Sequence, residues 1–270
     1  MSQATRSAHR ADGLENPAFQ SALSRLSRAS DAVWLLALTS GIVSTLFPAF
    51  FLPYPQFNVG RFFVYAGLLV RASLYVWAGD RLADRGGAVL RRLFLMGLVA
   101  GLFELLVDWW LVNGIVRGRL VYLSGPDVVL LSSPIWMPIA WACVIVELGY
   151  PLLRLFEWWQ KKLSLRMAAA LAALLCGVSA GMMVGFYEYF AYRAGWWMYQ
   201  PARRMLGDFC TLYIPVGEAI MFPALLPIAA NLLSEEKPTT AGAIAAGSQF
   251  AMMIAIGYGV AYVLLEGSFR

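Results

Sequence analysis

The sequence predicts an all-α membrane protein, a polytopic bundle of seven transmembrane helices. Hydrophobic residues make up 60% of the 270 residues and charged residues only 14%, whereas soluble domains are about 45–50% apolar and about 25% charged. Apolar residues also gather in runs long enough to cross a hydrocarbon core of about 30 Å, which takes about 20 helical residues. The predicted spans lie near 32–52, 61–79, 90–112, 128–149, 167–190, 210–232 and 242–265.

A polar segment, residues 1–31, precedes the seven-helix domain of residues 32–270. Asn16-Pro17 predicts the start of a short helix, because proline is favoured at the first helical position. One face of that helix is apolar, which is typical of an amphipathic helix that lies on a membrane surface. A disordered segment is the alternative. The apolar face consists of Phe19, Leu23 and Leu26.

The distribution of positive charge predicts the orientation. Of the 21 Lys and Arg residues, 13 fall on the N-terminal side of the bundle, 7 on the opposite side, and Arg71 inside a span. The positive-inside rule then predicts a cytoplasmic N-terminus and an external C-terminus. We expect a multi-pass protein of a bacterial inner membrane or an equivalent membrane. The net charge of +5 does not indicate a nucleic-acid partner, because the cations lie in short loops beside the bilayer.

Several kinds of cofactor site lack the residues they need. His9, in the polar segment, is the single histidine, which argues against histidine-ligated haem, di-iron and zinc sites. The three cysteines are scattered and form no CxxC motif. No lysine falls inside a predicted span, so a retinal Schiff base has no candidate, and there is no glycine-rich ATP loop. We therefore expect neither a metal nor a cofactor.

Two acids inside the third predicted span are the main functional signal. Glu104 and Asp108 are four residues apart and therefore share a helix face. Charged side chains are costly in the membrane and face the bundle interior, where they pair or mark a functional site. A rise of about 1.5 Å per residue puts Glu218 and Arg71 at a depth similar to that of Glu104. The same count puts Glu147 at the cytoplasmic edge, in contact with water.

The charges in this layer do not balance. Arg71 can neutralise one or two acids, but Glu104, Asp108 and Glu218 make three. A carboxyl group without a cation in a low-dielectric site retains its proton. A neutral acid beside an ionised one is the arrangement that a proton donor requires. We predict Glu104 and Glu218 as proton donor and acceptor, Asp108 as their partner, and Arg71 as the group that keeps one acid ionised.

Aromatic side chains are predicted around these acids, and their faces stabilise cations. A protonated acid in a dry, aromatic-lined cavity suits acid-catalysed chemistry on a lipid and needs no metal. The partner is then a membrane lipid or another hydrophobic substrate. The predicted substrate-binding residues are Trp109, Tyr122, Trp136, Trp141, Tyr187, Glu188 and Tyr213.

A resemblance to a known group of enzymes points the same way. Glu104, the loop 118–122 (GRLVY) and the segment 134–141 (PIWMPIAW) form an ordered series. The series resembles the acid, tyrosine-containing loop and proline-rich Ala-Trp helix of membrane carotenoid-biosynthesis proteins of the hydratase and cyclase type. More broadly it is similar to small seven-span terpene cyclases. The resemblance implies a lyase or isomerase acting on an isoprenoid, with Glu104 and Glu218 as the acids and Asp108 assisting. The Pro-x-Glu-Glu motif of lycopene cyclases is replaced by the segment 215–218 (PVGE).

Two other classes of function stay open. The segment 79–86 (GDRLADRG) is similar to a loop signature of major-facilitator transporters, so a proton-coupled carrier of small molecules is one alternative. Those transporters have two six-span halves, whereas seven spans are predicted here. A non-catalytic membrane assembly protein, in which the acids only pair, is the other. The sequence predicts no substrate, product or oligomeric state.

Overall fold

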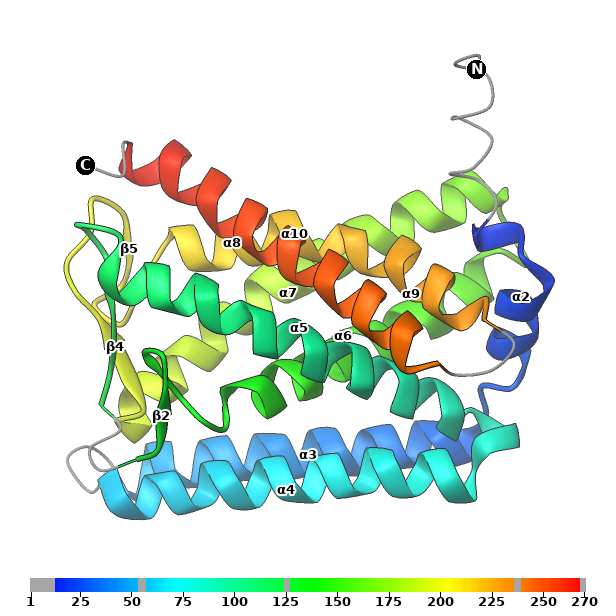
Figure 1. Ribbon diagram of the computed structural model, residues 1–270, viewed down its shortest axis with the longest axis horizontal. Coiled ribbons are helices and arrows are strands. Elements are labelled where there is room, and N and C mark those ends of the chain that lie inside the picture. Colours follow the sequence, from blue (N-terminus) through cyan, green and yellow to red (C-terminus); the bar gives the residue numbers. More distant parts are fainter. Residues whose placement is uncertain (1–12, 53–56, 124–126, 236–238, 268–270) are drawn as a thin grey trace.

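The structure, a computed structural model, is 78% helical and contains seven helices long and apolar enough to cross a membrane (Figure 1). It describes residues 13–52, 57–123, 127–235 and 239–267, with the backbone alone for 57–61. The all-α, seven-span prediction is confirmed, while the cytoplasmic location of the N-terminus stays a prediction. His9 lies outside the described residues, as do five of the cationic side chains counted above: Arg6, Arg10, Arg61, Lys237 and Arg270.

The helices follow the predicted spans closely at most ends. They are α2 (Pro17–Ser24), α3 (Arg28–Phe51), α4 (Phe57–Arg81), α5 (Gly87–Asn113), α6 (Met137–Trp159), α7 (Leu165–Ala194), α8 (Tyr213–Met221), α9 (Leu225–Leu233) and α10 (Thr240–Glu266), with short 3₁₀ helices η1 (Ala83–Arg85) and η2 (Phe222–Ala224).

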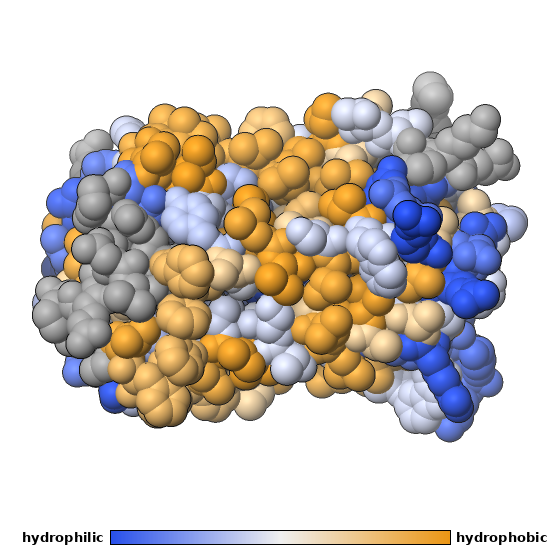
Figure 2. Space-filling view, turned by 90° about the horizontal axis from the view of Figure 1, so that it is seen from below, coloured by the Kyte–Doolittle hydropathy of each residue, from blue (hydrophilic) through white to orange (hydrophobic). Residues whose placement is uncertain are grey.

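The bundle has an apolar middle and hydrophilic ends. Figure 2 shows an orange band between blue ends on the face that α3 and α4 form. Exposed side chains such as Leu36, Phe62 and Leu69 belong to this apolar surface. Lipid can cover such a surface, whereas a water-exposed face of this size would be unfavourable.

Helices α3 and α4 form a pair below the other helices in Figure 1. Helix α5 packs most extensively against α6 and also contacts α10 and α4, while α7 packs against α3, α6 and α8. Glycines permit the closest approaches. A Cβ atom on Gly101 of α5 would lie 2.7 Å from the Pro138 backbone of α6, so only glycine fits this crossing without movement.

The fourth span lies further along the chain than the sequence predicted. It is Met137–Trp159 instead of 128–149, because Pro138 occupies the first turn of α6, where proline is tolerated. Pro134 lies in a strand before the helix and therefore does not interrupt it. The expectation that Glu147 lies in water at the cytoplasmic edge is wrong for the same reason: Glu147 is near the middle of α6 and 8% exposed.

The sixth span is divided near its centre, at a proline. The span Tyr213–Leu233 is divided into α8 and α9 by η2, which contains Pro223. Because proline lacks a backbone donor, it interrupts the α-helical hydrogen-bond series here.

Short antiparallel strands connect helices at one end of the bundle. They are β1 (Leu120–Tyr122), β2 (Val129–Leu130), β3 (Ser133–Pro134), β4 (Trp197–Tyr199), β5 (Met205–Leu206) and β6 (Cys210–Thr211), paired β1 with β4, β2 with β3 and β5 with β6. Tyr122 is opposite Trp197 in the first pair, so this pairing fixes two aromatic residues beside the bundle interior.

Helix α2 begins after Asn16, whose side chain accepts a hydrogen bond from the Ala18 N–H. Its apolar face packs against the protein's own helices α6 and α9. Phe19 is fully buried and stacks on Phe156, with ring centroids 6.0 Å apart. This packing differs from the membrane-surface contact that the amphipathic pattern suggested.

Candidate functional site

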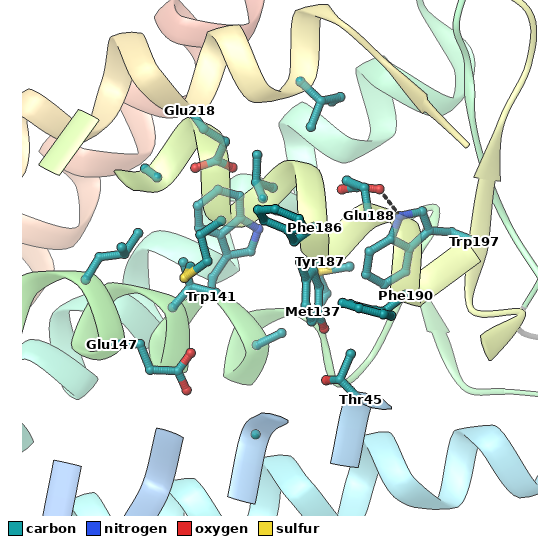
Figure 3. Close-up of a pocket in the computed structure, with 18 of the residues that line it drawn as sticks. Thr45, Met137, Trp141, Glu147, Phe186, Tyr187, Glu188, Phe190, Trp197 and Glu218 are labelled. Atoms are coloured by element: carbon teal, nitrogen blue, oxygen red, sulfur yellow. Dashed lines mark hydrogen bonds between the residues drawn. The ribbon is translucent and has the colours of Figure 1, made fainter. Parts of the chain in front are cut away.

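A cavity of about 420 Å³ lies inside the bundle among α3, α5, α6, α7 and α8. This size is within the range of small-molecule sites. Figure 3 shows acidic and aromatic side chains from different helices around it. All four predicted catalytic residues line this one cavity: Arg71, Glu104, Asp108 and Glu218.

Asp108 is held by two hydroxyl groups. The Tyr122 hydroxyl donates a hydrogen bond to its Oδ2, and Ser133 Oγ lies 2.7 Å from the same oxygen. The antiparallel pairing of β1 with β4 positions Tyr122, and β3 positions Ser133. Burial, followed by the nearby Asp108 carboxyl group, raises the pKa of Tyr122 well above its ordinary value. Tyr122 therefore stays a hydroxyl donor, and Asp108 acts as the acceptor.

Glu104 is almost completely buried, and its carboxyl group is within hydrogen-bonding reach of Asp108 and Trp141. Among the described residues, no donor is placed to bond its Oε2. Two ionised carboxylates cannot donate to each other. The contact between Glu104 and Asp108 therefore requires a proton, as in other carboxyl pairs that share a site. Asp108 already accepts two hydrogen bonds, so Glu104 is the better position for this proton.

Glu218 reaches the cavity from α8, opposite the acids of α5. Its carboxyl group accepts a hydrogen bond of 2.7 Å from the Tyr258 hydroxyl of α10. Gly217 makes this approach possible, because a Cβ atom there would lie 2.5 Å from the Tyr258 ring. Figure 3 shows Glu218 directed towards the cavity above Trp141. The predicted convergence of the α5 and α8 acids is thus present in the structure.

Glu188 supplies a fourth acid, from α7. It is 5% exposed and accepts a hydrogen bond from the Trp197 indole N–H, a contact drawn in Figure 3. Within the described part of the chain, no Lys or Arg forms an ion pair with Glu188 or with the other three acids, Glu104, Asp108 and Glu218. All four are held by hydroxyl or indole donors, or by each other.

Arg71 does not pair with any of these four acids, which corrects its predicted role. Its Nη1 is 2.7 Å from Glu147 Oε1, and its Nε donates to the Gly67 carbonyl at 3.2 Å. Both side chains of the Arg71–Glu147 pair are less than a tenth exposed. The prediction failed because the fourth span was placed too early in the chain, which put Glu147 at the cytoplasmic edge and not at the depth of Arg71.

The structure separates the predicted aromatic residues into two groups. Trp109 is 49% exposed and faces away from the cavity, and Tyr213 is fully buried outside it, donating to the Gly118 carbonyl at 2.7 Å. Neither of these two residues therefore lines the cavity. Trp109 follows Asp108 directly, so the helix turns it towards another face. The predicted residues that do line the cavity are Tyr122, Trp136, Trp141, Tyr187 and Glu188.

Three residues that line the cavity or hold its acids were not predicted from the sequence. Trp197 lies outside the predicted spans, but it is 5% exposed and stacks on Trp136 with centroids 6.1 Å apart. Tyr258 is one aromatic residue in an apolar run, and Ser133 lies in a loop, so neither carried a signal. Their roles depend on pairings between distant segments.

The described residues contain no group of three or more His, Cys, Asp or Glu side chains placed to hold a metal ion. The carboxyl and hydroxyl groups around the cavity are groups that can donate and accept protons.

Comparison with known proteins assigns the chain to a family. A family model described as a domain of unknown function (DUF6989) matches residues 105–265. The chain belongs to this family. No curated protein and no solved structure matches it. The DUF6989 region contains Asp108, Glu188 and Glu218, whereas Glu104 lies one residue before it and Arg71 lies on an earlier helix.

Proposed function

We propose that the protein is an intramembrane enzyme that moves protons to and from a hydrophobic substrate, in the manner of a cyclase, hydratase or isomerase. One observation carries the proposal: four buried acids from three helices meet in one cavity without a cationic partner among the described residues. An acid that serves only to fix helix packing is normally paired with a base, as Glu147 is with Arg71.

The two sides of the cavity suit two different roles. Glu104, with the proton shared with Asp108, is the donor, and Asp108 is stabilised as the remaining carboxylate by Tyr122 and Ser133. Glu218 is the acceptor on the opposite wall. Protonation of an alkene carbon by Glu104 and loss of a proton from a neighbouring carbon to Glu218 moves a double bond or closes a ring. If water adds instead, the product is a hydrate. No oxidant or reductant is consumed.

The walls of the cavity support a substrate that is dissolved in the bilayer. Ile42 of α3 and Phe186 of α7 line it, yet they are 47% and 65% exposed on the lipid-facing side of the bundle. A hydrocarbon chain can therefore enter between α3 and α7 without crossing water. An isoprenoid is the substrate class that the resemblance to carotenoid and terpene enzymes implies.

The test compares lipid extracts from cells that express wild-type protein, Glu104→Gln or Glu218→Gln. Mass spectrometry and chromatography should reveal a lipid that differs from its precursor by no mass or by one water, and that both variants fail to make. Glu157→Gln is the matched control, because Glu157 lies near the end of α6 outside the cavity and pairs with Arg154 and Lys161. Identical extracts from wild type and both cavity variants would contradict the proposal.

The same variants separate the enzyme from a carrier. A proton-coupled carrier would lose proton flux in sealed vesicles when Glu104 or Glu218 is replaced, and no lipid would change covalently. The segment 79–86, which is similar to the transporter loop, forms a turn and gives no further support for a carrier. Asp80 pairs with Arg91, and Gly86 adopts a left-handed conformation with φ of 86°.

A further inference from the structure

The cavity contains a second polar group, and its donors are not all used. Arg71 lines the cavity on the side of α3. Its Nε and Nη1 are bonded to Gly67 and Glu147, but no described residue accepts a hydrogen bond from Nη2. Arg71 is 7% exposed, and Nη2 is not among the fully buried atoms that lack a partner, so it keeps some accessible surface. A buried guanidinium with an unbonded amino group can donate a hydrogen bond to a ligand atom, and leaving that donor unpaired is unfavourable.

A glycine on the neighbouring helix leaves space for this guanidinium. A Cβ atom on Gly41 of α3 would lie 2.8 Å from Arg71 Nη1. Thr45 follows Gly41 by one helical turn and therefore shares its face. The Thr45 side chain is buried and lines the cavity, and its hydroxyl has no partner among the described residues. Figure 3 shows Thr45 and Glu147 on the side of the cavity next to α3.

We propose that Arg71 and Thr45 bind a neutral oxygen atom of the substrate, so that the ligand is a long apolar chain carrying a hydroxyl or carbonyl group. This inference rests on the proposed function, since it assigns the substrate class to the same cavity. A plain hydrocarbon would leave the Arg71 amino group unpaired, at the cost of a buried donor. Lipid access between Ile42 and Phe186 accounts for the apolar chain.

The charges around Arg71 favour a neutral polar group on the ligand over an anionic one. Glu147 already balances the charge of Arg71. The rest of the cavity contributes four carboxyl groups and no further cation from the described residues. A phosphate or carboxylate would add negative charge in a low-dielectric space, which is unfavourable without a new cation. A neutral oxygen accepts the free N–H without that penalty.

The test measures binding to the full-length protein in lipid nanodiscs. A radiolabelled long-chain alcohol is competed by three unlabelled probes of the same chain: the alcohol, the hydrocarbon and the monophosphate. We expect the alcohol to compete about tenfold better than the hydrocarbon, as one hydrogen bond to a charged donor implies. The monophosphate should compete less well than the alcohol.

Two variants connect this preference to the named residues. Arg71→Lys retains the charge that faces Glu147 but lacks the second amino group, so the preference for the alcohol should disappear while hydrocarbon binding persists. Thr45→Val should reduce the preference for the alcohol in part. If Arg71→Lys does not fold, Thr45→Val tests the inference in its place. Equal competition by alcohol and hydrocarbon, tightest binding of the monophosphate, or an unchanged preference in a folded variant would overturn the inference.

Glu104→Gln separates this inference from the proposed function. That variant should retain the preference for the alcohol and lose product formation. A wild-type protein that binds the alcohol selectively but changes no lipid would contradict the enzyme and leave the binding site standing.

Discussion

The bundle buries two groups of charged side chains, and they are satisfied in different ways. Arg71 and Glu147 form an ion pair between α4 and α6. Glu104, Asp108 and Glu218 converge from α5 and α8 without a Lys or Arg partner among the described residues, and hydroxyl groups hold two of them. Removing one member of an ion pair exposes the other as an uncompensated charge, whereas neutralising an acid that already holds a proton changes little. The comparison therefore separates residues that maintain the fold from residues that are free to exchange protons.

The largest expected effect comes from breaking the ion pair. Arg71→Met should lower the free energy of unfolding by about 3–5 kcal/mol, because Glu147 is left buried without a partner. Arg71→Met combined with Glu147→Gln should recover most of that loss. Thermal unfolding of the purified protein in detergent measures both. An Arg71→Met protein as stable as wild type would mean that the pair is not buried as described.

A smaller loss is expected where α5 meets α6 beside the acids. Gly101→Ala places a Cβ atom 2.7 Å from the Pro138 backbone, and forcing the helices apart should cost about 1–3 kcal/mol. Gly259→Ala is the matched control, because no heavy atom lies within 4 Å of its Cβ position. Alanine is the better helix former, so this control should be neutral or stabilising by up to about 1 kcal/mol. Equal stability of the two variants would argue against the close crossing.

The hydroxyl groups around Asp108 should contribute less to the free energy of unfolding than the ion pair or the close helix crossing. Tyr122→Phe removes one of two donors and should cost about 1 kcal/mol near neutral pH. Since the folded pKa of Tyr122 is raised, its neutral form stabilises the fold fully below the ordinary tyrosine value of about 10, and this contribution is lost as the pH rises above it. Wild type should therefore lose stability in alkali more steeply than Tyr122→Phe, by up to about 1.4 kcal/mol per pH unit. Parallel pH profiles of the two proteins would contradict this.

The sequence was sufficient for the features that depend on local pattern. Hydropathy predicted seven spans, and the spacing along the predicted spans put Glu104 and Glu218 at similar depth, with Asp108 one helical turn from Glu104. Features that depend on contacts between distant segments were not predictable. The partner of Arg71 was missed because the fourth span was predicted to begin near residue 128, whereas α6 begins at Met137 with Pro138 in its first turn.

The aromatic residues also show what local sequence pattern does not predict. Trp109 and Trp141 were both predicted to bind substrate, and of the two only Trp141 lines the cavity. Helix rotation decides this, and an apolar helix with lipid on one side and protein on the other gives little periodicity from which to read the rotation. Tyr122 and Trp197 reach the site through strand pairing, which their short segments do not indicate.

The smallest expected effect on stability belongs to Glu104. Glu104→Gln replaces an acid that we take to be protonated by a neutral group of the same shape, and the free energy of unfolding should change by less than about 1 kcal/mol. A loss as large as that of Arg71→Met would instead indicate an ionised, structurally paired Glu104.

The protonation of Glu104 can be measured directly by infrared spectroscopy of the purified protein at neutral pH. We expect a carbonyl stretch from a protonated carboxyl group that shifts in heavy water, is absent from Glu104→Gln and is unchanged in the control Glu157→Gln. A spectrum with no protonated carboxyl group at neutral pH, or one that Glu104→Gln leaves unaltered, would contradict the claim that this cavity holds a proton ready for transfer.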